Sequence, residues 1–319
     1  MWKKVFLTLA ILGIGLIAAY GVGSMLRPSI QGRIFETLVW RTDVKQQNAL
    51  LLQQNAAPHT SIGPSPELQA RYAISSKQAG GHTVWTIAPR TGATERQVLY
   101  LHGGAYVAGI AEMHWNSVAA FIDHCQCTFI MPDYPLAPQH TVDDALAMLL
   151  PLYGELVEMN GATHLTLLGE SSGGGLALAL AMRLREADLE QPADLILLSP
   201  WLDVTMNNPA IAEADKLDPI LNVQGLQDAG KAWAGTHPLT DYQVSPIYGN
   251  LEGLAPIMLF MGTHDVFIAD ARKLAAQAKT ARARLDYHEY DGMLHCWYIT
   301  DYLPETKELL KLVSERIGS

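Results

Sequence analysis

Short apolar runs alternate with longer segments of helical periodicity from about residue 70 to the C-terminus. Eight of these runs have the length and composition of strands, and the first two form a predicted hairpin. The runs are 72–76, 83–88, 98–101, 128–131, 165–168, 195–198, 257–261 and 285–290. The clearest helical patterns are 142–159, 174–186, 269–282 and 304–317. Because buried parallel strands are continuous apolar runs separated by crossover helices, the chain predicts an α/β fold with an antiparallel start and a mostly parallel eight-stranded sheet.

The N-terminal segment follows a different pattern. Residues 5–26 are 22 consecutive residues without a charge, and a helix of this length, about 33 Å, can cross a hydrocarbon core of roughly 30 Å. We expect an uncleaved membrane anchor over residues 1–29, with the body of the protein on the extracytoplasmic side. The alternative is a cleaved signal peptide, because residues 21–23 have the small-x-small form of a cleavage site. Cleavage would leave a secreted or periplasmic protein.

Two more segments depart from the alternation of strands and helices. Residues 30–55 repeat apolar positions at helical spacing, and a linker rich in Ser and Pro follows at 59–66. Residues 207–246 mix polar, Pro and Trp residues, as an insertion over the sheet would. The sequence therefore predicts helices and a linker over 30–66 and one domain over 67–319 that carries the insertion.

The charge is unevenly distributed along the chain. Residues 1–60 carry six basic and two acidic side chains, a net charge of +4, so the rest of the chain must carry −14 of the overall −10. An acidic body of this kind argues against a nucleic-acid partner, which requires clustered Lys and Arg. The oligomeric state is left open by the sequence.

The three cysteines cannot form a disulfide framework, since at most one bridge can form and one thiol is left over. The segment His124-Cys125-Gln126-Cys127 resembles half of a metal site, but it lacks a second pair of ligands at zinc spacing. We therefore interpret it as a helix end that leads into a buried strand. No metal or other cofactor is expected.

The clearest chemical motif is G-x-S-x-G at Gly169-Glu170-Ser171-Ser172-Gly173, which follows the strand at 165–168 and precedes a helical pattern. In this context the motif predicts a sharp strand-to-helix turn that exposes the Ser171 hydroxyl as a nucleophile. Glycines two residues before and after the serine avoid collisions with neighbouring chain. A phosphate-binding loop is excluded because no Lys follows at the required spacing.

A second glycine motif follows the strand at 98–101, in the order His102-Gly103-Gly104-Ala105. Acyl transfer builds negative charge on the former carbonyl oxygen, and fixed backbone N–H groups stabilise it. Small residues allow the backbone to approach that oxygen. We expect the oxyanion hole to consist of N–H groups of Gly103, Gly104 or Ala105 together with Ser172, and we expect His102 to brace this loop.

The acid and the base of a serine hydrolase with this chain order follow the next two strands. Asp265 follows the run 257–261, and His295 follows the run 285–290. Asp265 would orient the imidazole, and His295 would take the proton of Ser171 and return it to the leaving group. Four nearby residues are weaker candidates for these roles: Asp270, Asp291, His264 and His288.

Together these motifs resemble the hormone-sensitive-lipase-like family of α/β-hydrolases, which includes bacterial carboxylesterases and acyl deacetylases. The resemblance covers about residues 70–319, and Ser199-Pro200-Trp201-Leu202-Asp203 is also similar to a family segment. Asp133-Tyr134-Pro135-Leu136-Ala137-Pro138-Gln139 is similar to another, but it lacks that segment's Arg and Glu. It is therefore open how this loop is held.

The resemblance implies an α/β-hydrolase fold with a helical lid, formed by residues 30–60 and 207–246. A lid of this kind implies an apolar acyl pocket, which Trp233, Trp201 and Tyr106 would line unless they belong to the core. The sequence thus predicts a membrane-anchored serine esterase for short- to medium-chain acyl esters. The alternatives are an amide, lactone or sterol-ester deacetylase with the same triad, and an inactive binding protein of hydrolase fold.

Overall fold

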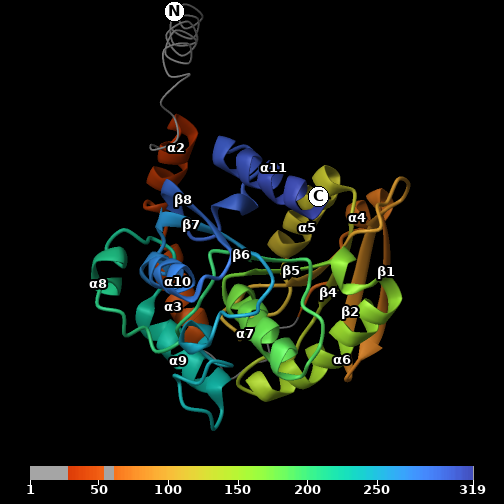
Figure 1. Cartoon of the computed structure of the whole chain (residues 1–319). Helices are drawn as coiled ribbons and strands as arrows, with labels where there is room; N and C mark the ends of the chain where they lie inside the picture. Colours follow the sequence, from red (N-terminus) through yellow and green to blue (C-terminus); the bar gives the residue numbers. More distant parts are fainter. Residues whose placement is uncertain (1–27, 54–60, 319) are drawn as a thin grey trace, which may run out of the picture.

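An eight-stranded sheet runs through the centre of the computed structural model, which describes residues 28–53 and 61–318 (Figure 1). The strands are β1 Tyr72–Ala79, β2 His82–Pro89, β3 Gln97–Leu101, β4 Thr128–Pro132, β5 Leu165–Glu170, β6 Asp194–Leu198, β7 Ile257–His264 and β8 Leu285–Leu294. Their order across the sheet is β1-β2-β4-β3-β5-β6-β7-β8. β2 is antiparallel to β1 and β4, and the remaining neighbours pair in parallel. The predicted α/β fold and all eight predicted strands are confirmed.

Helices cover both faces of this sheet (Figure 1). The α-helices are α2 Ile30–Val39, α3 Val44–Gln53, α4 Pro66–Arg71, α5 Glu112–Cys125, α6 Val142–Asn160, α7 Ser172–Glu186, α8 Ile211–Ala214, α9 Val223–Ala234, α10 Ile268–Ala281 and α11 Pro304–Gly318. Short 3₁₀ turns are η2 Ala162–His164, η3 Pro246–Tyr248 and η4 Trp297–Ile299. The four helices read most clearly from the sequence, α6, α7, α10 and α11, begin and end within two residues of their predicted bounds.

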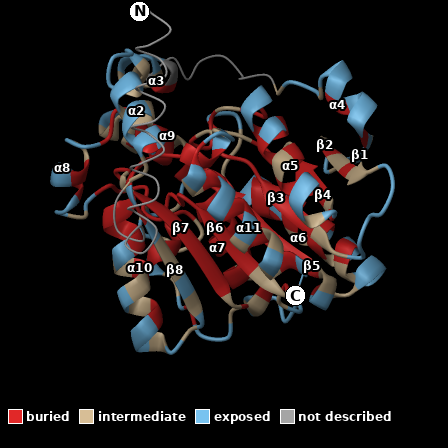
Figure 2. Ribbon diagram, turned by 90° about the horizontal axis from the view of Figure 1, so that it is seen from above, coloured by how far each residue is buried: buried red, intermediate tan, exposed pale blue. Residues whose placement is uncertain are grey.

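Two hydrophobic cores lie on opposite faces of the sheet because side chains alternate along each strand. In β3, Leu99 and Leu101 join the core under α6, α7 and α10, whereas Val98 and Tyr100 join the core under α5 and α11. Figure 2 shows the result, with buried strands at the centre and the exposed sides of the helices outside. The central strands are therefore apolar on both faces, which explains their continuous hydrophobic runs.

Two of the longer helices, α5 and α9, were not delimited by the periodicity of the sequence. Only the end of α5 and a helical lid over 207–246 were expected there. The inner face of α5 includes the polar residues His114 and Ser117, which are both buried and interrupt the apolar pattern. α9 contains Gly225 and Gly230, where a Cβ would touch Leu52 and Val204. These glycines lower helix propensity but allow close packing, so the reason for them becomes visible only in the fold.

The insertion at 207–246 contains α8 and α9, and the N-terminal helix α3 packs against α9. Lys45 of α3 donates hydrogen bonds to the Asp215 carboxylate at 2.8 Å and to the Asp218 carbonyl oxygen at 2.8 Å. The side chain of Asn48 donates to the carbonyl oxygen of Ile220 at 2.9 Å. The N-terminal helices and the insertion thus form one covering over the carboxyl ends of the central strands.

The predicted anchor falls almost entirely on residues that the structure leaves undescribed, since the description begins at residue 28. Among residues 28–53 and 61–318, no helix has the length and apolar character needed to cross a membrane.

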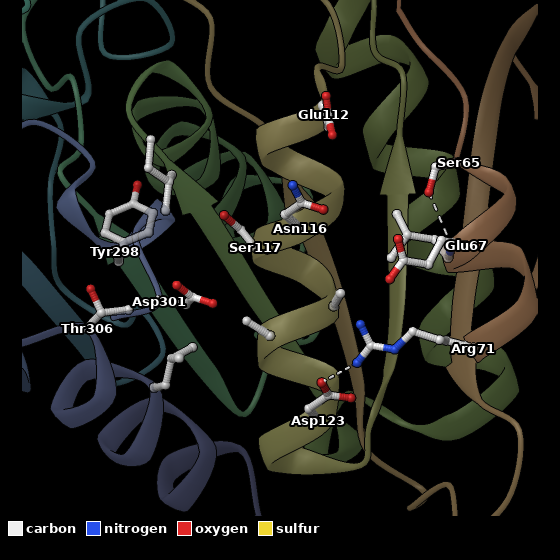
Figure 3. A pocket seen from close by; sticks show the side chains of 15 residues that line it. Ser65, Glu67, Arg71, Glu112, Asn116, Ser117, Asp123, Tyr298, Asp301 and Thr306 are labelled. Carbon is white, nitrogen blue, oxygen red and sulfur yellow. Dashed lines mark hydrogen bonds and ion pairs between the residues drawn. The ribbon is translucent and has the colours of Figure 1, made fainter. Parts of the chain in front are cut away.

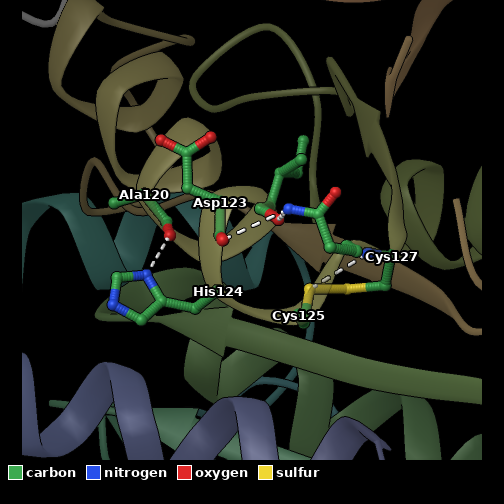
Figure 4. The surroundings of a disulfide bond; sticks show 7 residues. Ala120, Asp123, His124, Cys125 and Cys127 are labelled. Atoms are coloured by element: carbon green, nitrogen blue, oxygen red, sulfur yellow. Dashed lines mark hydrogen bonds between the residues drawn. A yellow bond between two sulfur atoms is a disulfide. The ribbon is translucent and has the colours of Figure 1, made fainter. Parts of the chain in front are cut away.

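Cys125 and Cys127 form a disulfide between the end of α5 and the start of β4, and Cys296 is a free, buried thiol (Figure 4). This agrees with the expected upper limit of one bridge. The segment His124–Cys127 is a helix end that leads into a strand, as predicted, because α5 ends at Cys125 and β4 begins at Thr128. Within the described ranges, no cluster of His, Cys, Asp and Glu has the arrangement of a metal site.

Candidate active site

Ser171 lies on the turn between β5 and α7, at the carboxyl edge of the sheet. Its backbone has φ 51° and ψ −122°, a conformation that costs a non-glycine residue about 1–3 kcal/mol. The turn is held by backbone bonds, since Ser171 N–H donates to Leu198 O at 2.9 Å and Trp201 N–H donates to Ser171 O at 2.8 Å. The strand-to-helix turn predicted from the motif is therefore present.

The flanking glycines are required by close backbone contacts. A Cβ at Gly169 would lie 2.1 Å from the carbonyl oxygen of Gly173. A Cβ at Gly173 would lie 2.1 Å from the carbonyl oxygen of Leu101 and 2.4 Å from that of His102. Any larger residue at these positions would push the nucleophile turn away from the end of β3.

The other two predicted residues lie beside Ser171. His295 Nε2 is 3.0 Å from Ser171 Oγ, and His295 Nδ1 is 2.7 Å from Asp265 Oδ2. Asp265 Oδ1 accepts a further hydrogen bond from the backbone N–H of Phe267 at 2.9 Å. Three residues that are far apart in the sequence thus form one continuous hydrogen-bonded chain.

This chain of groups is almost closed to solvent. Ser171 and His295 are each 8% exposed, and Asp265 is 0% exposed. Burial by itself lowers the pKa of His295, but the adjacent Cys296 and the hydrogen-bonded Asp265 carboxylate outweigh it and raise that pKa above its usual value. The low local dielectric strengthens the interaction between the ring and the carboxylate.

The loop after β3 passes directly beside the nucleophile. A Cβ at Gly103 would lie 3.2 Å from Ser171 Cβ, and Gly104 adopts φ +117°, where a side chain would also collide with Ala108 O at 2.4 Å. Ala105 has φ 54°. Ser172 is the first residue of α7, and a helix offers no internal acceptor to the N–H groups of its first turn. Of these four residues, Gly103 lies against Ser171, and Ser172 follows Ser171 directly in the chain.

The loop at 133–139 holds the glycine loop without the Arg and Glu of similar segments. Tyr134 OH donates to His102 O at 2.7 Å, and its ring stacks on the His102 ring with centroids 4.4 Å apart. Ala137 N–H donates to Tyr106 O at 2.9 Å. Burial lowers the pKa of His102 to about 4, so its ring is neutral, and its Nδ1 is 2.7 Å from Gly103 O. His102 thus contacts the loop it was expected to brace.

Three aromatic residues considered for an acyl pocket form a buried stack instead. Tyr106 lies between Trp233 of α9, with centroids 4.2 Å apart, and Trp201, with centroids 5.4 Å apart. All three are at most 1% exposed. The stack continues through Phe267, whose ring meets the edge of His295 at 5.3 Å. These residues are core side chains that connect the insertion to the carboxyl edge of the sheet, where His295 lies.

Asp218 of the insertion is a polar residue near the site that the sequence did not single out. It is 0% exposed, and its Oδ2 accepts from Val266 N–H at 2.9 Å, next to Asp265. Its Oδ1 accepts from the N–H groups of Ile220 and Leu221 at 2.7 and 2.9 Å. Burial and the nearby Asp265 raise the pKa of Asp218 to about 6. An Asp-Pro pair at 218–219 signals a turn in the sequence, but nothing local points to Val266.

Each rival candidate from the sequence has another contact. His264 Nδ1 is 2.6 Å from Glu36 Oε1 of α2, and Asp270 accepts from the Asn208 amide at 2.8 Å. The His288 ring stacks on Phe260. Asp291 accepts from the Thr263 hydroxyl at 3.2 Å. The geometry therefore favours Asp265 and His295 as the partners of Ser171.

A separate depression lies over the outer side of α5, between α4 and α11 (Figure 3). Its polar lining includes Glu67, Glu112, Asp301 and the Arg71–Asp123 ion pair, in which the two side chains are 2.8 Å apart. None of Ser171, Asp265 and His295 belongs to this lining. The depression is thus distinct from the hydrogen-bonded chain.

Comparison with known proteins supports one family. A sequence profile described as alpha/beta hydrolase fold matches residues 98–299. An esterase of Acinetobacter venetianus is 30% identical over 226 residues, which cover 68% of this chain and 73% of the relative. An acetyl-hydrolase of Streptomyces hygroscopicus is 30% identical over 223 residues, with the same coverage of 68% and 73%.

Solved structures show the same fold. The esterase EstE5, in a crystal soaked with ethyl alcohol, superimposes with a TM-score of 0.74 at 26% identity, covering 85% of this chain and 96% of that chain. An esterase from the bacterial hormone-sensitive lipase family superimposes with a TM-score of 0.72 at 24% identity, covering 86% and 96%. The chain therefore belongs to the hormone-sensitive-lipase-like family of α/β-hydrolases, and it is a carboxylesterase-type hydrolase.

Proposed function

We propose that this protein hydrolyses carboxylic esters of short- to medium-chain acyl groups through a Ser171-His295-Asp265 triad and an acyl-enzyme. The observation that carries the proposal is the continuous geometry of the three groups, with 3.0 Å between His295 Nε2 and Ser171 Oγ and 2.7 Å between His295 Nδ1 and Asp265 Oδ2. Both distances are those of hydrogen bonds. The nucleophile, the base and the group that orients the base thus occur in the order that the reaction needs.

In the first half of the reaction, His295 Nε2 accepts the proton of Ser171 as Oγ attacks the ester carbonyl carbon. Asp265 fixes the ring with Nδ1 as the protonated nitrogen and stabilises the imidazolium that forms. The protonated Nε2 then gives its proton to the departing alkoxide, and an ester between Ser171 and the acyl group remains. In the second half, water attacks this ester under the same base, which releases the acid and restores Ser171.

The negative charge that develops on the carbonyl oxygen requires fixed donors. We assign this role to the N–H of Ser172 together with N–H groups of Gly103, Gly104 or Ala105. Two observations support the assignment. Ser172 lies in the first turn of α7, and Gly103 is so close to Ser171 that a Cβ on Gly103 would lie 3.2 Å from Ser171 Cβ. Removal of one such donor typically costs about 100- to 1,000-fold in kcat.

A fluorophosphonate probe tests the nucleophile directly. We expect the wild-type chain to react at Ser171 and the Ser171→Ala variant to remain unlabelled. Ser75→Ala, a change at an exposed serine of β1, is the matched control and should label like the wild type. Wild-type protein that stays unlabelled in its native state would instead favour an inactive binding protein, and labelling that persists in Ser171→Ala would place the nucleophile elsewhere.

The acyl group is tested with a series of p-nitrophenyl esters from acetyl to palmitoyl. We expect kcat/KM to be highest for acyl chains of two to about eight carbons. Because one relative is named an acetyl-hydrolase, a deacetylase for amides, lactones or sterol esters is the second candidate. Turnover of a matched acetamide that equals or exceeds that of the acetyl ester would favour this candidate.

We also propose that residues 1–29 tether the catalytic domain to a membrane on its extracytoplasmic side. The support is the 22-residue uncharged run in the sequence and the Cys125–Cys127 disulfide, since disulfides persist mainly in oxidising compartments. Membrane association that resists alkaline carbonate, together with digestion by protease added outside the cell, is the expected result. A chain released by carbonate or protected from the protease would contradict it.

A further inference from the structure

α2 is apolar on two opposite sides. Its inner side packs on β8: Gly32 is buried, and a Cβ there would lie 2.5 Å from Met293 Cε. Its outer side carries Ile30, Ile34 and Leu38, which are 63%, 55% and 53% exposed. These three residues are spaced four apart, so they form one row along the helix.

A row of exposed large apolar residues on a helix is a common mark of an interaction surface. Trp40, the C-cap of α2, is also 48% exposed, but it lies outside the row because residues two positions apart on a helix do not share a face. Arg33 and Arg41 are exposed on the same helix or directly after it. The outer row together with Trp40 and these two cations is here named the α2 surface.

α2 contacts β8 and lies above β7 and β8 in the view of Figure 1. Glu36 of α2 contacts His264, the residue before Asp265, at 2.6 Å. Gly32 contacts Met293, two residues before His295. A partner of the α2 surface would therefore lie next to both catalytic loops.

We propose that the α2 surface docks onto the headgroup and upper acyl region of a lipid bilayer. The chain that precedes it argues for this partner: the uncharged run of residues 5–26, long enough to span a bilayer, ends four residues before α2 begins at Ile30. With that run in the bilayer, as proposed above, α2 would begin at the level of the headgroups. Apolar residues beside Trp and Arg are the composition of helices that lie in this interface.

Docking of α2 in this way brings the covering formed by the N-terminal helices and the insertion at 207–246 against the membrane. Esters dissolved in the bilayer could then reach Ser171 without crossing the aqueous phase. This consequence rests on the proposed esterase function, whereas the docking itself rests on the proposed membrane tether, so the two are tested separately.

The docking test uses the full chain in phosphatidylcholine vesicles, with an environment-sensitive dye on a cysteine introduced by Ile34→Cys. The native thiols interfere little, because Cys125 and Cys127 are bonded to each other and Cys296 is 6% exposed. The control is Thr91→Cys, an exposed position after β2, near the sheet edge opposite to β8. We expect doxyl-labelled lipid to quench the dye at position 34 at least twofold more than the dye at position 91.

Equal quenching at the two positions would overturn the proposal, and so would a chain that does not bind vesicles. If a second copy of the chain covers α2 instead, the dye at position 34 will change its emission with protein concentration in the absence of lipid. Light scattering would then show a dimer, and this outcome also overturns the proposal.

The consequence is tested with the double variant Ile34→Ser/Leu38→Ser. We expect turnover of a long-chain ester dissolved in vesicles to fall about three- to tenfold, while turnover of p-nitrophenyl acetate in solution changes less than twofold. Gln31→Ser/Thr37→Ser, at two exposed polar positions of the same helix, is the matched control and should retain both activities. Equal loss on the two substrates would contradict entry from the bilayer.

Discussion

The nucleophile half and the acid half of the site are built in different ways. Ser171, its flanking glycines and Ser172 lie within five consecutive residues, and the turn is shaped by backbone contacts such as that of Gly173 with Leu101. Asp265 lies between His264, which contacts Glu36 of α2, and Val266, which donates to Asp218 of the insertion. One half therefore depends on close backbone contacts, and the other depends on side chains from two distant segments, α2 and the insertion.

This difference affects how each half responds to change. Backbone atoms at the nucleophile turn are so close that a single methyl group has no space. The acid half contains polar contacts that can be removed one at a time without a collision. We therefore expect steric changes to be severe in the first half, and charge changes to be graded in the second.

The largest effect is expected for Asp265→Asn, which keeps the size of the acid but removes its charge. By analogy with other triads, kcat should fall about 10,000-fold, because the ring loses its correct tautomer and the stabilisation of its charged form. Since Asp265 helps to raise the pKa of His295, the acid limb of the residual kcat/KM profile should move to lower pH. Hydrolysis of p-nitrophenyl acetate over a series of pH values measures both the fall in kcat and the shift of the acid limb. An unchanged acid limb would contradict the role proposed for Asp265.

Gly173→Ala tests the steric half. The new methyl would lie 2.1 Å from Leu101 O and 2.4 Å from His102 O, so the free energy of unfolding should fall by about 3 kcal/mol or more. Gly154→Ala in α6 is the control, because nothing lies within 4 Å of its Cβ, and it should stabilise the chain by about 0.5–1 kcal/mol. Urea unfolding measures the two values. Similar stabilities for both variants would show that the turn tolerates side chains.

The pH dependence of stability tests the acid half. The pKa of Asp218 is raised from 3.8 to about 6, so the folded state binds its proton more tightly than the unfolded state does. The folded protein is therefore destabilised by this group as pH rises from about 4 to about 7, by an amount on the order of 3 kcal/mol. Subtraction of the Asp218→Asn unfolding curve from the wild-type curve isolates this slope. A difference that does not vary with pH would contradict it.

The smallest effect is expected where α3 meets the insertion. Lys45 and Asp215 form a partly exposed ion pair, and Lys45 also donates to Asp218 O, so Lys45→Met should lower the free energy of unfolding by about 1 kcal/mol. Lys77→Met removes the more exposed pair with Glu155 and should cost less. An equal loss of unfolding free energy in the two variants would mean that the contact between Lys45 and the insertion adds no stability beyond that of an exposed ion pair. Urea unfolding of both variants decides.

Much of the fold was predictable from periodicity. The central strands pack on both faces, so each is a continuous apolar run, and α6, α7, α10 and α11 repeat apolar residues on one side. Only the end of α5 was predicted, because His114 and Ser117 occupy its inner face and interrupt the apolar pattern. The bounds of α9 within the expected helical lid were not predicted, because its glycines, which lower helix propensity, fit against Leu52 and Val204.

The chemistry of the site was predictable where one short motif contains both the reactive side chain and the glycines that shape its turn, as at Ser171. The order of strands then directed attention to Asp265 and His295, which the structure brings within hydrogen-bonding distance. Asp218 was not predictable in this way, because its partner Val266 is 48 residues away and donates only a backbone N–H. The aromatic stack of Tyr106, Trp201 and Trp233 was equally invisible as a unit.

The sequence by itself determined the class of fold, the nucleophile turn and the candidates for acid and base, because these depend on local spacing and on the order of elements. Only the tertiary structure decided which aromatic residues are core, which side chains support Asp265 and which side of α2 is left exposed. The physical reason is that burial and long-range polar contacts depend on which distant segments meet. Periodicity describes a segment's own faces, and the fold decides what each face contacts.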